Sequence, residues 1–330
     1  MTTKLFRSIL AVAAAVTLVS ANPSPAFAHS RVAPPPSIAS RPLAAPAPER
    51  TIYYDQTQYF NGVYQSLSPI WEHVDRVTHR PYVTDVMLAA FHLGYNGSVP
   101  YIHLNDNVPS DPMFDVMWPE VSTLQSDGIT VRMMLGGAAQ GSYADLFQHW
   151  STFYPILKQT LQQYKLNGID LDVEETVSLQ DIQHLIRRLR FDFGKNFLVT
   201  LSPVCSALWG GANLSGFSYI DLYNSPQGRD IAWFNAQFYS GFGSLSSPSD
   251  YDHVVGGGVF TADKVVAGVI ANPHDGNGFI PIATLVGTVH TLVTEHNNFG
   301  GLADWEYFDA LPGGQANPVE WARIVSRAMR

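Results

Sequence analysis

Residues 167 to 174 read Asn-Gly-Ile-Asp-Leu-Asp-Val-Glu, and this stretch decides both the expected fold and the expected chemistry. Apolar and acidic residues alternate along it, which predicts a β-strand, because successive side chains of a strand point to opposite faces. Asp170, Asp172 and Glu174 therefore share one face, about 7 Å apart at each step. Like charges in this arrangement repel one another and raise at least one pKa. A purely structural strand has no reason to bear that cost, so the spacing predicts a proton-transferring site.

The first 50 residues differ in composition from the rest of the chain. Lys4 and Arg7 precede an apolar run over 9–19 and small residues up to Ala28, the pattern of a cleaved secretory signal peptide. That run is shorter than the roughly 18 residues that a membrane-spanning helix needs. From 29 to 50 the chain is rich in Pro, Ala and Ser, which predicts a linker or propeptide. We therefore expect a signal peptide at 1–28, a linker at 29–50 and a secreted, extracellular protein.

The remaining part, residues 51–330, has the length of one α/β barrel and requires no second domain. Without the signal peptide the chain keeps 28 acidic and 17 basic residues, a formal charge of −11. Nucleic acids and anionic membranes are therefore not expected as partners. Cys205 is the only cysteine, so the chain has no internal disulfide, and we expect a monomer.

Short apolar runs recur through this domain and are separated by stretches of helical periodicity, the pattern of repeated βα units. One such stretch, 178–193, carries an apolar stripe and is followed by Gly194, as is typical of a helix end. Eight parallel strands with intervening helices predict a single (β/α)8 TIM barrel, with its active site at the carboxyl ends of the strands. The expected strands are 51–56, 84–93, 131–136, 168–174, 197–203, 232–239, 264–270 and 301–305.

The barrel assigns a depth to each acid of the fourth strand. Asp170 should lie deepest, Asp172 next and Glu174 at the mouth, where a side chain can reach a substrate. All three acids come from one strand and are too widely spaced to converge on one cation, so we expect no metal site and no cofactor.

Other strand ends add candidates for the same site, each with a plain structural alternative. The alternative for the glycines is an ordinary turn, for the tyrosine a core aromatic position and for the tryptophan a packing role alone. We place Gln237 beside the acids and expect the following residues to contact substrate: Tyr239, Trp305, Gly136, Gly137 and Phe91.

These motifs resemble those of glycoside hydrolase family 18, the chitinases and endo-β-N-acetylglucosaminidases, over essentially all of residues 51–330. The family motif Asp-Gly-x-Asp-x-Asp-x-Glu matches here except that Asn167 replaces its first Asp. The family's Ser-x-Gly-Gly appears as residues 134–137, Met-Leu-Gly-Gly, without the Ser. Its Met-x-Tyr-Asp appears as residues 237–240, Gln-Phe-Tyr-Ser, and its strand-eight tryptophan matches Trp305.

Within the family, longer runs look most like the secreted fungal endo-β-N-acetylglucosaminidases. Examples are 103–106, His-Leu-Asn-Asp, and 305–308, Trp-Glu-Tyr-Phe. Only about 30 residues separate 270 from 301, so we see no inserted α+β domain of the kind that deepens many chitinase clefts. A shallower cleft suits a branched glycan.

The resemblance implies a retaining, substrate-assisted hydrolysis. Glu174 would be the general acid and base, with its pKa raised by Asp172, and the substrate's own 2-acetamido oxygen would be the nucleophile that forms an oxazolinium ion. Asp172 would orient the acetamido N–H, Tyr239 would donate to the acetamido oxygen, and Trp305 would form the floor under the −1 sugar. Asp170 would tune Asp172 by sharing a hydrogen bond or a proton.

The first interpretation is therefore an endo-β-N-acetylglucosaminidase that cuts between the two core GlcNAc residues of N-glycans of high-mannose type. Its partners would be N-glycans on glycoproteins. The alternative enzyme is an endochitinase acting on chitooligosaccharides, because both substrates present β-1,4-linked GlcNAc at the cleaved bond. A third alternative is a carbohydrate-binding lectin on a family barrel, although Glu174 and Tyr239 are both present.

Overall fold

The computed structural model describes residues 50–330. The expected signal peptide at 1–28 and residues 29–49 of the expected linker lie outside this part. Arg50, placed at the end of the linker by the sequence, is instead the first residue of strand β1 (Arg50–Asp55). Its backbone N–H donates to the carbonyl oxygen of Gly300 at 3.4 Å, which ties it to the neighbouring strand.

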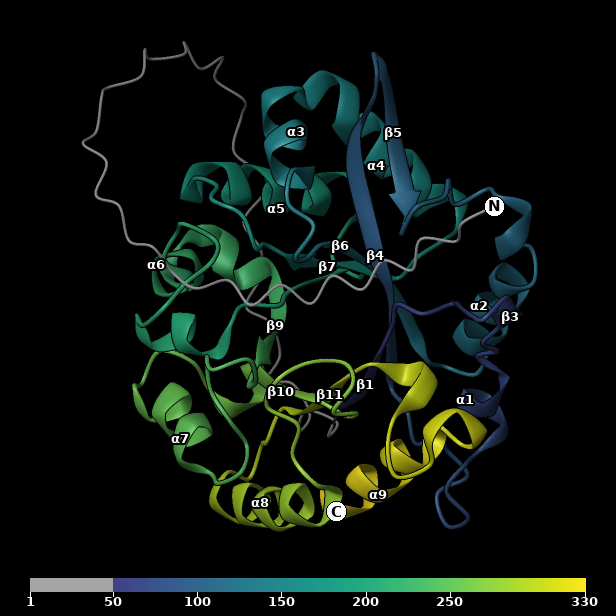
Figure 1. Cartoon of the computed structure of the whole chain (residues 1–330). Coiled ribbons are helices and arrows are strands. Elements are labelled where there is room, and N and C mark those ends of the chain that lie inside the picture. Colours follow the sequence, from purple (N-terminus) through teal and green to yellow (C-terminus); the bar gives the residue numbers. More distant parts are fainter. Residues whose placement is uncertain (1–49) are drawn as a thin grey trace. The chain divides into compact units, whose positions relative to one another are not determined.

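The described residues form the predicted closed barrel of eight parallel strands (Figure 1). Closure is visible in the pairing of β1, which is hydrogen-bonded to both β4 and β11, the second and the last strand of the barrel. The barrel strands after β1 are β4 (Asp85–Asn96), β6 (Thr130–Gly136), β7 (Gly168–Asp172), β8 (Leu198–Leu201), β9 (Ile231–Gln237), β10 (Val265–Ile270) and β11 (Gly301–Trp305).

Helices surround the barrel between its strands (Figure 1). They are α1 (Ser68–Glu72), α2 (Met117–Ser126), α3 (Ser142–Gln148), α4 (Trp150–Gln163), α5 (Leu179–Phe193), α6 (Tyr219–Asn224), α7 (Ser249–Gly256), α8 (Ile282–Glu295) and α9 (Val319–Ala328). Short 3-10 helices occupy Pro112–Phe114, Cys205–Trp209, Pro226–Asp230, Ala262–Lys264, Tyr307–Asp309 and Gly314–Ala316. No helix in residues 50–330 is both long enough and apolar enough to cross a bilayer.

Helix α5 shows how the sequence sets these boundaries. The hydroxyl of Ser178 accepts a hydrogen bond from the backbone N–H of Asp181 and caps the first turn. Gly194 ends the helix with φ +76°, a conformation that glycine adopts without strain. The predicted apolar stripe is buried against the barrel.

Four strands end earlier than the sequence indicates; β1 ends one residue early, at Asp55, and the ends of the other three matter for the site. Strand β7 ends at Asp172 rather than at 174, because the next residues bond elsewhere: the Ser215 hydroxyl donates to the carbonyl of Val173 at 2.6 Å. Strand β9 ends at Gln237 and β8 at Leu201. Glu174 and Tyr239 therefore lie just beyond strand ends, where the chain turns into loops.

One hairpin of the structure was not predicted from the sequence. Strand β4 continues beyond the barrel to Asn96 and returns as the antiparallel strand β5 (Val99–Leu104), which pairs with β4 alone in the sheet. A second short hairpin joins β2 (Tyr59–Phe60) to β3 (Val63–Tyr64).

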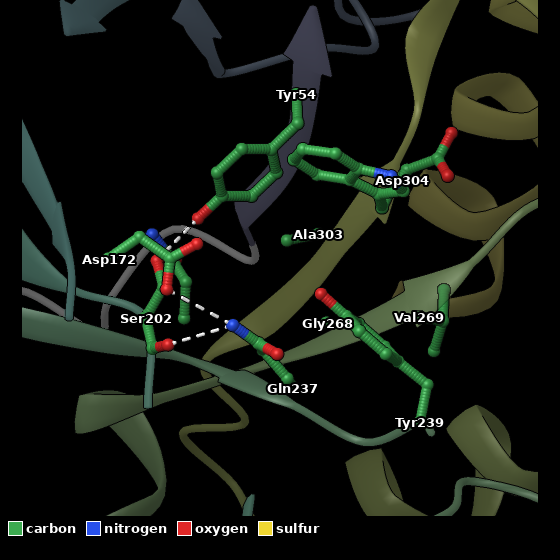
Figure 2. A pocket seen from close by; sticks show the side chains of 11 residues that line it. Tyr54, Asp172, Ser202, Gln237, Tyr239, Gly268, Val269, Ala303 and Asp304 are labelled. Atoms are coloured by element: carbon green, nitrogen blue, oxygen red, sulfur yellow. Dashed lines mark hydrogen bonds between the residues drawn. The ribbon is translucent and has the colours of Figure 1, made fainter. Parts of the chain in front are cut away.

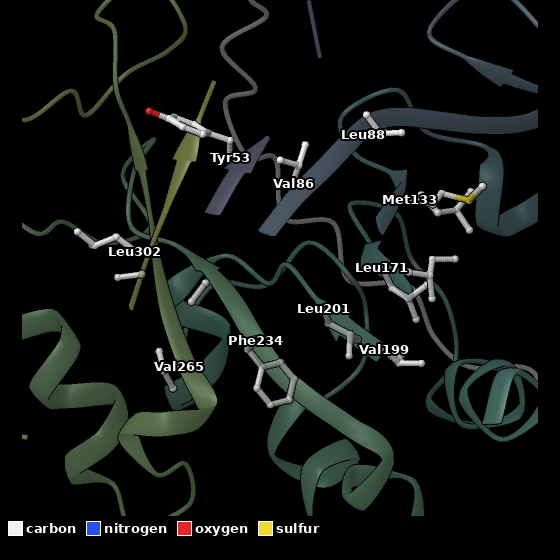
Figure 3. Packing of buried hydrophobic residues seen from close by; sticks show 14 of the residues in the cluster. Tyr53, Val86, Leu88, Met133, Leu171, Val199, Leu201, Phe234, Val265 and Leu302 are labelled. Carbon is white, nitrogen blue, oxygen red and sulfur yellow. The ribbon is translucent and has the colours of Figure 1, made fainter. Parts of the chain in front are cut away.

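Two hydrophobic clusters hold the barrel together. The larger fills the layer between strands and helices, and Figure 3 shows some of its members, among them Leu171, Val199 and Leu302. The smaller lies inside the barrel and includes Met87, Met134 and Trp233. These apolar faces explain why every barrel strand is almost continuously buried, as expected for a parallel sheet covered on both sides.

The amino-terminal end of the barrel is closed by charged and aromatic side chains. Arg132 is fully buried and pairs with Asp85 at 2.6 Å. The guanidinium groups of Arg50 and Arg132 lie 4.1 Å and 4.3 Å from the ring of Trp233. These contacts occupy the interior at the amino-terminal end of the barrel.

Candidate active site

The polar residues singled out in the sequence meet at the carboxyl end of the barrel. Asp170 and Asp172 belong to β7, and Glu174 follows it directly. Gln237 is the last residue of β9, and Trp305 is the last residue of β11. The expected order of depth holds: Asp170 is 0 % and Asp172 5 % exposed, while Glu174 is half-buried.

Asp170 is held by four donors. Its Oδ1 accepts from the Thr200 hydroxyl at 2.5 Å and from the Asn235 amide at 3.0 Å. Its Oδ2 accepts from the Tyr54 hydroxyl at 2.7 Å and from the hydroxyl of Ser202. The buried carboxylate is thus fully satisfied, as a buried charge must be to be tolerated. None of these partners is Asp172, so the expected shared hydrogen bond between the two aspartates is wrong, and Asp170 acts on Asp172 through its charge.

Asp172 and Glu174 are joined by the side-chain amide of Gln237. Its Nε2 lies 3.2 Å from Oδ1 of Asp172, 3.1 Å from Oε1 of Glu174 and 3.0 Å from the carbonyl oxygen of Ser202. An amide has only two hydrogens for these three acceptors, so the two carboxyl groups compete for them. Figure 2 shows the Gln237 amide directed at Asp172 and Ser202.

Both of these carboxyl groups have raised pKa values. Burial raises the pKa of Asp172 well above its usual range, and the negative charges of Glu174 and Asp170 add to the effect. Burial also raises the pKa of Glu174, while the hydrogen bond from Gln237 opposes that shift. On sequence grounds, the charge of Asp172 was expected to raise the pKa of Glu174. Instead, burial is the main cause for Glu174, and the charge of Glu174 raises the pKa of Asp172. The pair can hold a proton at a pH where ordinary carboxyl groups are ionised.

Tyr239 and Trp305 line the same pocket as Asp172 and Gln237 (Figure 2). Burial, followed by the charge of Asp172, raises the pKa of Tyr239 well above its usual range, so its hydroxyl stays protonated and can donate. The Trp305 ring is half-buried and lies 5.7 Å from the Tyr54 ring, centroid to centroid. Asp172, a hydroxyl donor and an aromatic surface therefore share one cavity, and Glu174 is linked to it through the Gln237 amide.

Phe91 is not part of this cavity, and its predicted substrate contact is wrong. The side chain is 0 % exposed and packs in the layer between strands and helices. The reason is a register shift in β4 between Leu88 and Phe91, which places both Ala89 and Ala90 in the interior cluster and turns Phe91 outward.

Gly136 and Gly137 make room for β7. A Cβ at Gly136 would lie 2.3 Å from the carbonyl oxygen of Asp172, and one at Gly137 would lie 3.5 Å from Oδ2 of Asp172. The N–H of Gly137 donates to the same carbonyl at 2.9 Å. The two glycines allow the β6 end to approach the backbone beneath the acids.

Sequence reasoning missed the residues that support Asp170. They are Tyr54, Thr200, Ser202 and Asn235. One signal was available: Asn235 precedes Gln237 and Tyr239 by steps of two, so all three share a strand face, and Thr200 and Ser202 are spaced in the same way. Nothing in the sequence links these residues to Asp170, which is reached only through the closed barrel.

The expectation that Asp170, Asp172 and Glu174 hold no metal stays a prediction from their spacing. In the part of the chain that the structure describes, the group with suitable spacing is Asp252, Glu295 and His296, whose ligand atoms lie within 4.8 Å of one another. This group is on the helices α7 and α8 and the residue after α8, and Glu295 is exposed. It has no connection to the pocket residues.

Comparison with known proteins gives the chain its family. No protein-family model matches it. Chitinase 2 of Rhizopus oligosporus is 25% identical over 268 residues, 74% of this chain and 47% of that protein, so the chain spans about half the length of the curated relatives it matches.

Two solved structures are more similar. A chitinase from Aspergillus fumigatus is 40% identical with a TM-score of 0.75, covering 86% of this chain and 100% of that one. A fungal endo-β-N-acetylglucosaminidase of glycosyl hydrolase family 18 is 42% identical with a TM-score of 0.78, covering 85% of this chain and 98% of that one. With this identity over almost the whole of the related structure, the chain belongs to glycoside hydrolase family 18.

Proposed function

We propose that the chain is an endo-β-N-acetylglucosaminidase that hydrolyses the β-1,4 bond between the two core GlcNAc residues of N-glycans. The observation that carries the proposal is the carboxyl pair of Asp172 and Glu174, joined by the Gln237 amide beside Tyr239 and Trp305. This set contains a proton, a hydroxyl donor and an aromatic surface, which substrate-assisted cleavage next to an N-acetyl sugar requires.

In this proposal Glu174 protonates the leaving glycosidic oxygen. Burial raises its pKa, which supports a proton held near the working pH, and its position just beyond the end of β7 supports contact with the substrate. The 2-acetamido oxygen of the substrate attacks the anomeric carbon as the glycosidic bond breaks, giving an oxazolinium ion. Glu174 then takes a proton from the water that opens the oxazolinium ring, and the sugar is released with its anomeric configuration retained.

Two neighbours act on the acetamido group. Asp172 accepts a hydrogen bond from its N–H, which increases the electron density on the attacking oxygen and holds it in position. The Tyr239 hydroxyl donates to the acetamido oxygen, and Trp305 supports the apolar face of the sugar. Besides these side chains, the proposed steps use only the acetamido group of the substrate and water.

An open site supports an N-glycan as the substrate. Between β10 and β11 the described chain has only one loop, α8 and a short return, with no inserted domain to build a wall over the pocket. A branched glycan has bulk on several sides of the cleaved bond and needs this access. High-mannose type is our first choice of glycan, on the resemblance to the fungal enzymes, and we take the active form to be a monomer.

The second candidate is an endochitinase. The specific observation in its favour is the Aspergillus fumigatus chitinase, which is nearly as similar as the endo-β-N-acetylglucosaminidase and equally complete in its coverage. The catalytic residues serve both reactions, because each substrate presents the same N-acetyl sugar at the cleaved bond.

We place the protein outside the cell, where glycoproteins and chitin are found. The signal-peptide pattern of residues 1–28 supports this location. Amino-terminal sequencing of the protein recovered from culture medium tests it and defines the start of the mature chain. A mature chain that starts at or before residue 50 is expected, since Arg50 belongs to β1. A chain retained in the cell with residues 1–28 intact would contradict the location.

The function is tested by incubating the protein and its Glu174→Gln variant with a high-mannose glycoprotein and measuring the intact mass of the product. We expect one GlcNAc to remain at each site with the parent and at least a hundredfold slower reaction with the variant, as for loss of a general acid. Soluble chitooligosaccharides are the second substrate. Cleavage of these alone would favour the endochitinase, and cleavage of neither would favour a binding protein.

A further inference from the structure

One loop contacts both residues proposed to hold the N-acetyl sugar. We call residues 271–281, between β10 and α8, the β10–α8 loop. The backbone N–H of Ala271 donates to the carbonyl oxygen of Trp305 at 3.0 Å. Farther along, the carbonyl of Asn277 accepts from the N–H of Ser240 at 2.9 Å, and a Cβ at Gly278 would lie 3.2 Å from Cα of Tyr239. The loop is therefore in direct contact with the backbone at both Tyr239 and Trp305.

The loop is fastened by a group of acids that the proposed mechanism does not use. Asp275 comes from the loop, Asp304 and Glu306 flank Trp305, and Asp309 ends the 3-10 helix that follows. We call these four the acid cluster. The carboxyl groups of Asp275 and Asp309 are within hydrogen-bond reach of each other, an arrangement that is favourable when one of them carries a proton.

Several oxygens of the acid cluster are buried without a partner. Both carboxyl oxygens of Asp304 have no hydrogen bond, and the residue is 0 % exposed. Oδ2 of Asp275 and Oδ1 of Asp309 are likewise buried and unpartnered. Glu306 differs, since its carboxylate accepts from the backbone N–H of Thr57 at 2.8 Å and from the Thr57 hydroxyl at 2.8 Å. Uncompensated negative charge is costly here, which favours the protonated forms.

The titratable groups around the acid cluster are mostly acidic rather than basic. The other groups that influence the acid cluster are Tyr53 and the buried Asp55 of β1, with the exposed His274 as the single group of basic character. Burial first, and then the charge of Asp309, raises the pKa of Asp275 to about 8. Burial raises the pKa of Glu306 to about 7 and that of Asp304 well above its usual range.

The acid cluster is better suited to hold a proton than a metal cation. No three carboxyl groups of the acid cluster bring their oxygens within 4.8 Å of one another; in the described residues only Asp252, Glu295 and His296 meet that condition. A proton needs just two oxygens, which Asp275 and Asp309 supply.

We propose that Asp275 and Asp309 are positioning residues: a proton shared between their carboxyl groups holds the β10–α8 loop, and with it Tyr239 and Trp305, in the arrangement that binds the N-acetyl sugar. The inference rests on the sugar-binding roles proposed above for Tyr239 and Trp305. When the proton leaves, two adjacent carboxylates repel each other beside buried Asp304, and the loop loses its fastening. Sugar binding then weakens in alkaline solution.

The first experiment measures binding in the Glu174→Gln background, which separates binding from hydrolysis. Chitotetraose is titrated by calorimetry from pH 5 to pH 9 into this parent, into the parent with Asp275→Asn and into the parent with Asp127→Asn, a control at the exposed end of α2. An asparagine amide donates to Asp309 at every pH. We expect the dissociation constant of the parent and control to rise about tenfold from pH 6 to pH 9, equivalent to one pKa unit of coupling. With Asp275→Asn the rise should be less than about threefold.

Because Asp172 also titrates, only the difference between Asp275→Asn and its parent decides the outcome. Identical pH dependence of the two proteins would overturn the proposal. Asp309→Asn makes the same substitution on the other side of the hydrogen bond and provides the test if Asp275→Asn does not fold.

A second measurement needs no sugar. The protein is labelled with 5-fluorotryptophan, and the fluorine resonance of Trp305 is assigned from its loss in Trp305→Phe. We expect this resonance to shift between pH 7 and pH 9 in the native sequence and to stay constant in Asp275→Asn; a shift unaffected by the substitution contradicts the inference. The mass measurement with the glycoprotein decides the proposed function; if chitotetraose binds at no pH, the fluorine signal still decides the role of the acid cluster.

Discussion

At the scale of single residues, two aspartates of one strand have opposite environments. Asp170 accepts four hydrogen bonds, whereas Asp172 accepts one, from an amide that also faces Glu174. A carboxylate so well satisfied is suited to hold a fixed negative charge, and one so poorly satisfied is suited to gain or lose a proton. Their positions, two residues apart on the same face, explain how one strand supplies both.

Asp172→Asn should slow hydrolysis of the natural substrate by a factor of about 100, because the amide cannot accept the acetamido N–H and the attacking oxygen is less well held. The variant should still transfer the sugar from a preformed oxazoline donor, since that donor has already passed the step that Asp172 assists. Rates with both donors, measured by mass spectrometry, check this. Hydrolysis of the natural substrate at the parent rate would show that Asp172 is not the orienting group.

Tyr239→Phe should lower kcat by about tenfold to a hundredfold, the usual effect of removing one donor to developing charge, with little effect on stability. The reason is that no hydrogen bond from the Tyr239 hydroxyl to another described residue is present, whereas the Tyr54 hydroxyl contacts Asp170 and Ser202. Tyr54→Phe is therefore the matched control and should lower the free energy of unfolding by about 1–3 kcal/mol. Urea denaturation beside kinetics separates the two, and equal destabilisation of both variants would refute the distinction.

At the scale of elements, the ends of strands matter more than their middles. Strand β6 must pass close to the backbone of β7 at the point where the acids emerge, and Gly136 permits this with φ +94°. Strand β4 shows the opposite case, in which a register shift changes the face of every later residue. The hairpin that follows turns at Asn96-Gly97, a strong turn signal that the sequence analysis did not use. The strand was therefore expected to stop at 93.

Gly136→Ala should destabilise the protein by more than about 3 kcal/mol. The new methyl group would collide with the Asp172 carbonyl, and the alanine backbone would have to adopt a left-handed conformation. Gly141→Ala is the matched control: its φ is +117°, and open space surrounds the added Cβ. This control should show only the conformational cost, about 1–2 kcal/mol. Chemical denaturation of both variants measures the difference, and equal losses would show that the approach of β6 to β7 is not constrained.

At the scale of the whole molecule, the barrel collects buried acids at one end. Besides Asp172 and Glu174, the residues Asp55, Asp304 and Glu306 have raised pKa values, with burial as the first cause. These acids therefore bind more protons in the folded chain than in the unfolded chain between about pH 4, where free aspartates titrate, and about pH 8. Their contribution to stability falls as the pH rises through this window, whereas His92, His103 and His184, whose pKa values are lowered by burial, contribute the opposite trend below about pH 6.5.

Unfolding in urea at pH 5, 6, 7 and 8 should show a free energy that decreases by at least about 2 kcal/mol across the series, the effect of one buried carboxyl whose pKa is shifted by roughly two units. Asp304→Asn replaces the protonated acid by a neutral side chain of the same shape and should flatten this slope. Asp127→Asn should leave the slope unchanged. Stability that is constant or rises from pH 5 to pH 8 would contradict the assignment of raised pKa values.

The sequence by itself determined the eight strands, the barrel and the position of the acids on β7, because these follow from local alternation and from the length of each repeat. It also identified Gln237, Tyr239 and Trp305, since they stand at strand ends that any closed parallel barrel brings to one rim. These features depend on residues close to one another in the chain.

Only the tertiary structure decided the rest. Asp170 meets its four donors across sequence separations of 30 to 116 residues, and Asp275 meets Asp309 from a different loop, so no local pattern indicates either contact. The face of Phe91 depends on a single register shift, and the pKa of each acid depends on burial by the whole barrel. Alternation assigns a side chain to a face of its strand, but which groups share that space is set by long-range packing.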